Sequence, residues 1–387
     1  NQSALAKSLL PERIVVSVTD SFGTVKQGVN IQFGVSSVPT GATGQSLTAT
    51  QSATDSTGRA SAHLTLGDKP GSYAVTAASS GLTGSPITFT GTASVGAAAT
   101  LLAVSGNGQS GVVVTQISNP FVVTVMDASG NPVSGVVVRF ALESTPAAAV
   151  GQALTDTLVV TNANGQAVTR LKLGTKVGAY SVSASSVGLV GSPQTFNATA
   201  KAGVAALVNM PSGNILNGQV GSTLSLPAMV VVTDAFGNAV SGENVRYTIT
   251  SSPAGANGQG PRDTTVVTDG QGQTSVRFTA GTKVGTYTVT VSVGSLTPQV
   301  ITITATAGAA ASLALVSGNN QTAMGGSVLP DKFVVVVADV FGNVKQGASV
   351  QFAVTSTPLG ATGAALTSVE NVTDSTGHAS VHLKSGD

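Results

Sequence analysis

The stretch DAFGNAVSG at residues 234–242 occurs in four versions along this chain. The other three are DSFGTVKQG at 20–28, DASGNPVSG at 127–135 and DVFGNVKQG at 339–347. Successive copies begin 107, 107 and 105 residues apart. A repeat of this length is typical of an array of similar domains, and it argues against one large enzyme core.

Each copy has the composition of a tight turn. Asp opens it, Gly stands three residues later where φ can be positive, and Asn follows in three of the four copies. The predicted structural turn residues are Asp20, Gly23, Asp127, Gly130, Asp234, Gly237, Asp339 and Gly342. If φ at Gly237 is positive, we expect valine in its place to destabilise that domain.

The residues on either side of this turn alternate with a period of two. Phe121, Val123 and Val125 precede the second copy in this way, which indicates a strand with one face in a core. A second turn follows in each repeat, as TDSTG at 54–58 and 373–377, TNANG at 161–165 and TDGQG at 268–272. The predicted core aromatic residues are Tyr73, Tyr180, Tyr287, Phe33, Phe140, Tyr247 and Phe352.

Three of these tyrosines stand 15 residues after the glycine of the second turn. Each is either a tyrosine corner, with its hydroxyl bound to the backbone, or a core aromatic with its hydroxyl at the rim. The sequence leaves both interpretations open.

About seven short strands in each ~100 residues, without a helical period, predict an all-β fold. We expect a tandem array of immunoglobulin-like (Ig-like) β-sandwich domains that forms an elongated rod. The expected domains are 1–97, lacking its first strand, 98–204, 205–308, and 309–387, lacking its last two strands. The Ala/Gly linkers at 95–99, 201–206 and 307–311 are too short to act as free tethers.

The first and fourth repeats are more alike than neighbouring ones. Residues 20–68 and 339–387 share 29 identities in 49 positions at an offset of 319. We therefore expect blocks of three domains to recur in a longer parent array, with a sequence like that of 69–73 after Asp387.

The composition argues against several classes of partner. Charged residues make up 9% of the chain and the net charge is +1, which disfavours binding to nucleic acid or an anionic membrane. Trp is absent and aromatic residues are 4%, so platforms for stacking sugars or bases are scarce. Cysteine is absent, and no apolar run is long enough for membrane insertion by this segment.

Signals for catalysis or cofactors are weak. His63 and His382 are expected in an outward, solvated slot that Arg170 and Arg277 fill in other repeats. The segment 106–111 matches G-x-G-x-x-G but precedes a strand-like run instead of a helix. The repeated Asp residues favour turn capping over calcium, which needs six to eight oxygen ligands. We predict no catalytic residue, no cofactor and no metal, and therefore no enzyme.

The pattern V-x-D-x-x-G-N-x-V-x-G-x-x-V-x-F, at 125–140 and nearly so at 232–247 and 337–352, resembles bacterial Ig-like repeats of the invasin/intimin type. The second-turn segments at 54–60 and 373–379 and GAYSV at 178–182 extend the resemblance. In that family such repeats form the stalks of large bacterial surface adhesins. The resemblance implies an extracellular location, at the cell surface or secreted.

The leading hypothesis is a non-enzymatic structural repeat region, a rod-like extracellular stalk or spacer of a bacterial adhesion protein. Its expected partners are neighbouring domains of the same longer chain. One alternative is a protomer that self-associates into an extracellular filament or sheath, through apolar outward positions such as Val231 and Val336. A second alternative is a set of ligand- or carbohydrate-binding modules.

Overall fold

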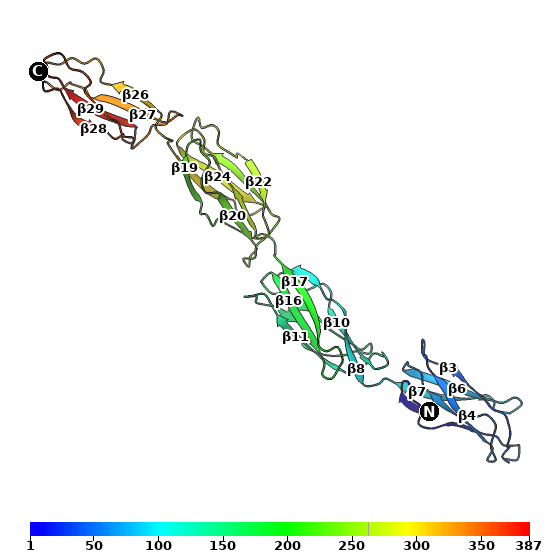
Figure 1. Ribbon diagram of the computed structural model, residues 1–387. Coiled ribbons are helices and arrows are strands. Elements are labelled where there is room, and N and C mark those ends of the chain that lie inside the picture. The colour runs from blue at the N-terminus through cyan, green and yellow to red at the C-terminus, as the bar shows by residue number, and fades with distance from the viewer. Residues whose placement is uncertain (262) are drawn as a thin grey trace. The chain divides into compact units, whose positions relative to one another are not determined.

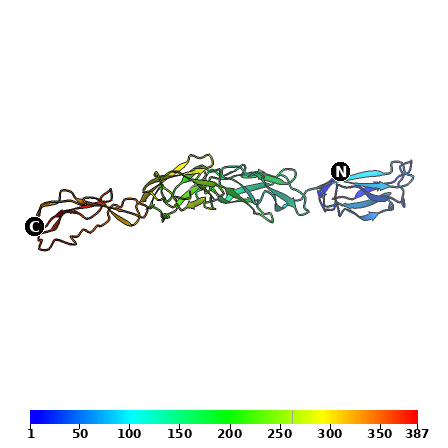
Figure 2. The same cartoon turned by 90° about the horizontal axis from the view of Figure 1, so that it is seen from above.

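The computed structural model describes residues 1–261 and 263–387. These residues form strands, turns and loops, and no helix appears among them (Figure 1, Figure 2). They divide into two compact units, Asn1–Lys201 and Ala202–Asp387. The all-β prediction is confirmed. We call the sequence ranges 1–97, 98–204, 205–308 and 309–387 repeats 1 to 4; their boundaries stay a prediction.

Repeat 1 contains two sheets, with strand orders β1-β7-β6-β3 and β2-β5-β4 (Figure 1). β1 pairs in parallel with β7, whereas the other pairs are antiparallel. The strands are β1 Gln2–Leu5, β2 Ile14–Ser17, β3 Gln32–Ser37, β4 Ser46–Gln51, β5 Arg59–Thr65, β6 Gly71–Ala78 and β7 Ile87–Ser94.

Repeat 2 completes unit 1 with sheets β14-β10-β8 and β13-β11-β16-β17-β9 and the short pair β12-β15. The strands are β8 Ala98–Ser105, β9 Gln109–Val112, β10 Phe121–Asp127, β11 Val137–Ser144, β12 Ala153–Leu154, β13 Leu158–Val160, β14 Gln166–Thr169, β15 Leu171–Lys172, β16 Gly178–Ser185 and β17 Gln194–Lys201.

Unit 2 contains repeat 3, with sheets β18-β20-β23 and β19-β25-β24-β21-β22, and repeat 4, with one sheet β26-β27-β29-β28. The strands of repeat 3 are β18 Leu207–Asn209, β19 Ile215–Gln219, β20 Ala228–Thr233, β21 Asn244–Ser251, β22 Asp263–Val267, β23 Gln273–Val276, β24 Gly285–Val293 and β25 Gln299–Thr306. Those of repeat 4 are β26 Ser312–Ser317, β27 Phe333–Ala338, β28 Ala365–Glu370 and β29 His378–Lys384.

The core of repeat 2 lies between its two main sheets. Phe121 of β10 stacks on Phe196 of β17, with ring centroids 4.8 Å apart, and these strands belong to different sheets. Val123, Val125, Tyr180 and Val182 are fully buried in the same cluster. The alternation read from the sequence therefore corresponds to a face that packs across a sandwich.

Repeat 4 differs from the others because the described chain supplies only one of its sheets. No counterpart of β24 or β25 is present among the described residues of this repeat. The segment 351–356, QFAVTS, forms no strand there, although QFGVSS of repeat 1 forms β3 against β6. A strand requires a neighbour to accept and donate its ladder hydrogen bonds, and the part of the chain that the structure describes places none beside 351–356.

Candidate functional site

The repeated Asp turn is the most regular polar feature of the structure. In repeat 2 the Oδ1 atom of Asp127 accepts hydrogen bonds from the backbone N–H groups of Ser129 and Asn131, both at 2.8 Å. Asp20, Asp234 and Asp339 bind the equivalent two N–H groups of their turns. Gly23, Gly130, Gly237 and Gly342 have φ between +76° and +82°, which the turn requires.

In repeats 2, 3 and 4 the second carboxylate oxygen binds the linker that enters the repeat. Gly96 N–H donates to Asp127 Oδ2 at 3.0 Å, and Gly308 N–H donates to Asp339 Oδ2 at the same distance. Within unit 2, Gly203 N–H donates to Asp234 Oδ2 at 2.9 Å. The sequence interpretation as a turn cap did not include this second role. Each of these three carboxylates joins a turn to a linker.

The asparagine of the motif reaches the preceding repeat. In unit 1, Asn131 Nδ2 donates to the backbone carbonyl of Asp68 at 2.9 Å and to Asp127 Oδ2 at 3.1 Å. In unit 2, Asn343 Nδ2 donates to the Thr282 carbonyl at 2.9 Å and to Asp339 Oδ2 at 2.9 Å. Asp68 and Thr282 stand at equivalent positions of their repeats. Both described junctions therefore use the same contact.

Repeat 1 carries a variant of this turn. Thr24 replaces the asparagine, and Asp20 Oδ2 pairs with Lys26 Nζ at 3.0 Å. In repeat 4 the matching Lys345 donates to the linker carbonyl of Ala307 at 3.2 Å. The lysine thus neutralises the carboxylate in one repeat and binds the linker in the other.

The buried Asp carboxylates are stabilised in their ionised form. Burial by itself raises the pKa of Asp127, but the N–H groups of Asn131, Gly96 and Ser129 outweigh it and hold the pKa below the ordinary 3.8. The same balance, with donors from Asn343, Gly308 and Phe341, lowers the pKa of Asp339. A carboxylate whose folded-state pKa is lowered stabilises the fold above its unfolded pKa.

We predict that acid weakens these junctions. The stabilisation is complete above pH 3.8 and is lost as the pH falls through the lower folded-state pKa of Asp127 and Asp339. The amide resonances of Gly96 and Gly308, followed by NMR during an acid titration, should shift with midpoints below 3.8. In Asp127→Asn the Gly96 titration should disappear while that of Gly308 persists. Midpoints at or above 3.8 would contradict the prediction.

A buried threonine ties the two turns of each repeat together. Thr161 Oγ1 donates to the Val133 carbonyl and accepts the N–H of Val136. Thr54, Thr268 and Thr373 make the equivalent pair of bonds. Sequence reasoning treated this threonine only as the start of the second turn; its recurrence in all four copies was the available signal.

In all three tyrosines the ring is buried and the hydroxyl is bonded to the backbone. The side chains of Tyr73, Tyr180 and Tyr287 are buried, and each hydroxyl donates to the backbone carbonyl four residues upstream, at 2.7, 2.9 and 2.7 Å. Phe140 and Tyr247 are buried as well, whereas Phe33 and Phe352 are half-buried. The hydroxyl fixes the loop before the strand, as a tyrosine corner does.

The slot of His63 is not simply solvated, and in this respect the sequence interpretation was wrong. His63 is half-buried, and its Nε2 atom lies 2.7 Å from the Leu10 carbonyl oxygen. Arg170 and Arg277 donate from the same slot to the carbonyls of Ser118 and Ser225. These side chains satisfy the backbone of the segment before the β10-type strand.

The described residues contain no group of three or more His, Cys, Asp or Glu side chains placed to hold a metal ion. The Gly-rich segment 106–111 overlaps a strand, β9, which begins at Gln109. No helix in the described part of the chain is long and apolar enough to span a bilayer. The Asp, Asn and Thr side chains described above form hydrogen bonds within turns, to linkers and across junctions.

The chain is related in sequence to a bacterial surface adhesin. It is 34% identical over 248 residues, 62% of its length, to the inverse autotransporter adhesin YeeJ of Escherichia coli strain K12. The chain spans about a tenth of the length of that curated relative. No family model matches the chain.

The solved structures with a similar fold include FdeC and invasin. The Escherichia coli adhesin FdeC aligns at 16% identity with a TM-score of 0.49, covering 78% of this chain and 94% of that one. Invasin, a bacterial integrin-binding protein, aligns at 16% identity with a TM-score of 0.45, covering 99% of this chain and 72% of that one.

Proposed function

We propose that the chain is a stalk or spacer. The premise is that its domains are bacterial Ig-like repeats of the type found in invasin/intimin-like surface adhesins. The chain would be a non-enzymatic, extracellular segment of a larger adhesion protein at the bacterial surface. Its task would be to hold a binding domain at a distance from the cell. Its immediate partners would be the neighbouring repeats of the same chain.

The observation that carries this proposal is the repeated junction contact. A spacer must fix the position of one domain relative to the next, which a free tether does not do. Asn131 and Asn343 bind a carbonyl of the preceding repeat, while Asp127 and Asp339 bind the linker glycine. Both junction carboxylates are almost fully buried, so water competes weakly for these bonds.

The chemistry of the recurring side chains supports the same conclusion. The recurring Asp, Asn, Thr and Tyr side chains, where a repeat has them, direct their polar atoms at the backbone of the domain or its junction. The sequence relation to YeeJ supports an adhesin context for such repeats.

We predict that inserting the whole chain between a membrane anchor and a terminal epitope raises the epitope above the cell surface. Two copies should raise it by about twice as much as one copy. The double variant Asn131→Ala, Asn343→Ala should fold but give a broader distribution of heights, because the junctions lose their cross-repeat bonds. Super-resolution imaging of the epitope measures both effects.

A binding module would behave differently in the same experiment. The purified chain would then attach to host cells or glycans on its own, and the epitope height would not matter for attachment. That result, or an unchanged height with one and two copies, would overturn the spacer proposal.

A further inference from the structure

The junction between repeats 3 and 4 (junction 3–4), within unit 2, contains an aromatic contact in addition to its polar bonds. Phe341, two residues after Asp339 in the Asp turn, lies against Gly221 of repeat 3. A Cβ atom on residue 221 would lie 2.6 Å from Cε2 and 2.7 Å from Cζ of the Phe341 ring. The ring therefore occupies the space that a side chain at position 221 would fill, and it remains 38% exposed on its other sides.

Polar bonds surround this aromatic contact. Asn343 Oδ1 accepts the backbone N–H of Val284 at 3.3 Å, and Asn343 Nδ2 donates to the Thr282 carbonyl at 2.9 Å. Lys283 Nζ lies 3.5 Å from the Phe341 carbonyl oxygen. The side-chain amide of Asn343 therefore binds repeat 3 through both its oxygen and its nitrogen.

In the junction between repeats 1 and 2 (junction 1–2), within unit 1, both halves of the aromatic contact are replaced. Ser129 stands at the position of Phe341, and Lys7 stands at that of Gly221. Lys7 and Gly221 share a left-handed backbone, with φ +65° and +66°. Because their backbones match, the Cβ of Lys7 takes the place that the Phe341 ring occupies beside Gly221.

The hydrogen bonding of junction 1–2 is reduced as well. Pro70 stands at the position of Val284 and has no backbone N–H, so Asn131 Oδ1 cannot receive the bond that Asn343 Oδ1 receives. The bond from Asn131 Nδ2 to the Asp68 carbonyl is kept. The two junctions therefore share the amide-to-carbonyl bond and differ in the contacts around it.

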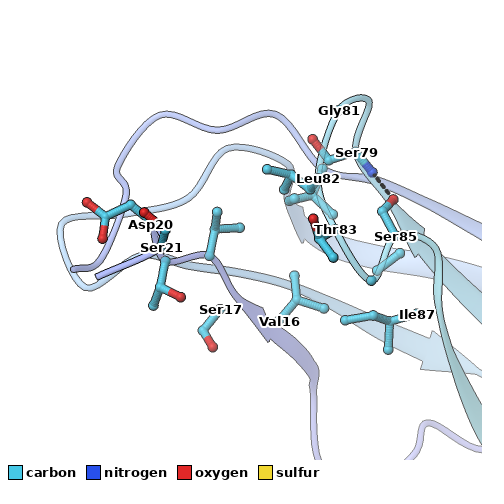
Figure 3. Close-up of a pocket in the computed structure, with 15 residues that line it drawn as sticks. Val16, Ser17, Asp20, Ser21, Ser79, Gly81, Leu82, Thr83, Ser85 and Ile87 are labelled. Carbon is cyan, nitrogen blue, oxygen red and sulfur yellow. Dashed lines mark hydrogen bonds between the residues drawn. The ribbon is translucent and has the colours of Figure 1, made fainter. Parts of the chain in front are cut away.

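An aromatic residue is the usual occupant of this turn position. Phe22, Phe236 and Phe341 hold it in repeats 1, 3 and 4, and serine stands there in repeat 2. Figure 3 shows the start of the repeat 1 turn, where Asp20 and Ser21 lie beyond the end of β2. The turn of repeat 2 keeps its Asp bonds without an aromatic ring. The turn itself therefore does not require the ring.

We propose that Gly221 is a docking surface for the aromatic ring of the following repeat, and that this pair makes junction 3–4 stiffer than junction 1–2. Domains joined through a small polar contact move relative to each other by default. The Phe341 ring adds apolar contact that a tilt of repeat 4 would expose to water. Junction 1–2, with Ser129 and Lys7, lacks this contact and acts as a hinge. The proposal concerns the joints themselves and does not rest on the spacer function.

Distances between spin labels, measured by pulsed dipolar spectroscopy on the whole purified chain, report on each junction separately. The chain contains no cysteine, so labels go only to introduced ones. One chain carries Thr90→Cys and Thr157→Cys across junction 1–2, and another carries Thr304→Cys and Val369→Cys at the equivalent exposed positions across junction 3–4. The distance distribution is expected to be about twofold wider across junction 1–2. Equal widths would overturn the proposal.

A change of residue in the turn tests the ring itself. Phe341→Ser, which introduces the residue of repeat 2, is expected to widen the distribution across junction 3–4 towards that of junction 1–2. The matched control is Val340→Ala, because Val340 is 76% exposed and alanine stands at its position in repeat 2. This control should leave the width unchanged. Equal effects of the two substitutions would contradict the docking role of the ring.

The reverse change tests both halves of the pair. Ser129→Phe combined with Lys7→Gly is expected to narrow the distribution across junction 1–2. Ser129→Phe alone should not, because the Cβ of Lys7 still fills the place of the ring. A double variant as broad as the unchanged chain would overturn the proposal, and so would equal narrowing by the single variant.

Discussion

Replacing Gly272 with valine is expected to unfold repeat 3, at a cost of more than about 4 kcal/mol. Gly272 has φ +70°, and a Cβ there would lie 2.5 Å from the carbonyl oxygen of Val232 and 3.1 Å from the N–H of Val240. Both are backbone atoms, and the Val232 N–H is itself bonded to the Gly272 carbonyl. Neither atom can move without breaking the ladder of β20.

Gly237 provides the matched control in the same repeat. Its φ is +76°, so valine is strained there too, but its Cβ would meet no atom within 4 Å. We expect Gly237→Val to cost about 1–3 kcal/mol from backbone strain alone. Hydrogen exchange of the β20 amides measures both effects, with β10 of repeat 2 as the internal reference. Equal losses in the two variants would show that the close approach at Gly272 is not the cause.

Tyr180→Ala is expected to destabilise repeat 2 by about 3–5 kcal/mol. The ring is 0% exposed and packs in the cluster that includes Phe140 and Phe196, so its removal leaves a cavity between the sheets. Thermal unfolding of the whole chain should show an early transition assigned to this repeat. An unchanged first transition would contradict the assignment of Tyr180 to the core.

Tyr180→Phe isolates the hydroxyl. The ring stays, and only the 2.9 Å hydrogen bond to the Lys176 carbonyl is lost, at a cost of about 1 kcal/mol. A loss close to that of Tyr180→Ala would mean that the loop bond, and not ring packing, holds the repeat together.

Several features of the fold were readable from the sequence because local chemistry fixes them. The Asp and Gly of the first turn have side-chain and backbone requirements that few other residues meet. The period of two before Asp127 identifies the buried face of β10 without any knowledge of its partner. The size and strand pattern of the repeat then allow few architectures besides a sandwich.

Only part of the candidate site could be predicted from the sequence. Sequence reasoning identified Asp127 as a turn cap, since a cap acts within five residues of chain. It did not identify the bonds of Asp127 to Gly96 or of Asn131 to Asp68, which join residues 31 and 63 positions apart. No local pattern encodes such pairs; only the folded junction brings their atoms together.

Two nearly identical segments show that the sequence of a segment does not by itself determine whether it forms a strand. QFGVSS at 32–37 and QFAVTS at 351–356 have the same alternation, yet only the first is a strand, because β6 lies beside it. Leu101 and Leu313 occupy equivalent positions, yet one is buried and the other exposed. The sequence by itself determined the turns, the strand faces and the repeat. The tertiary structure decided which strands form and which side chains are covered, because ladder bonds and burial both require a second element at the right place.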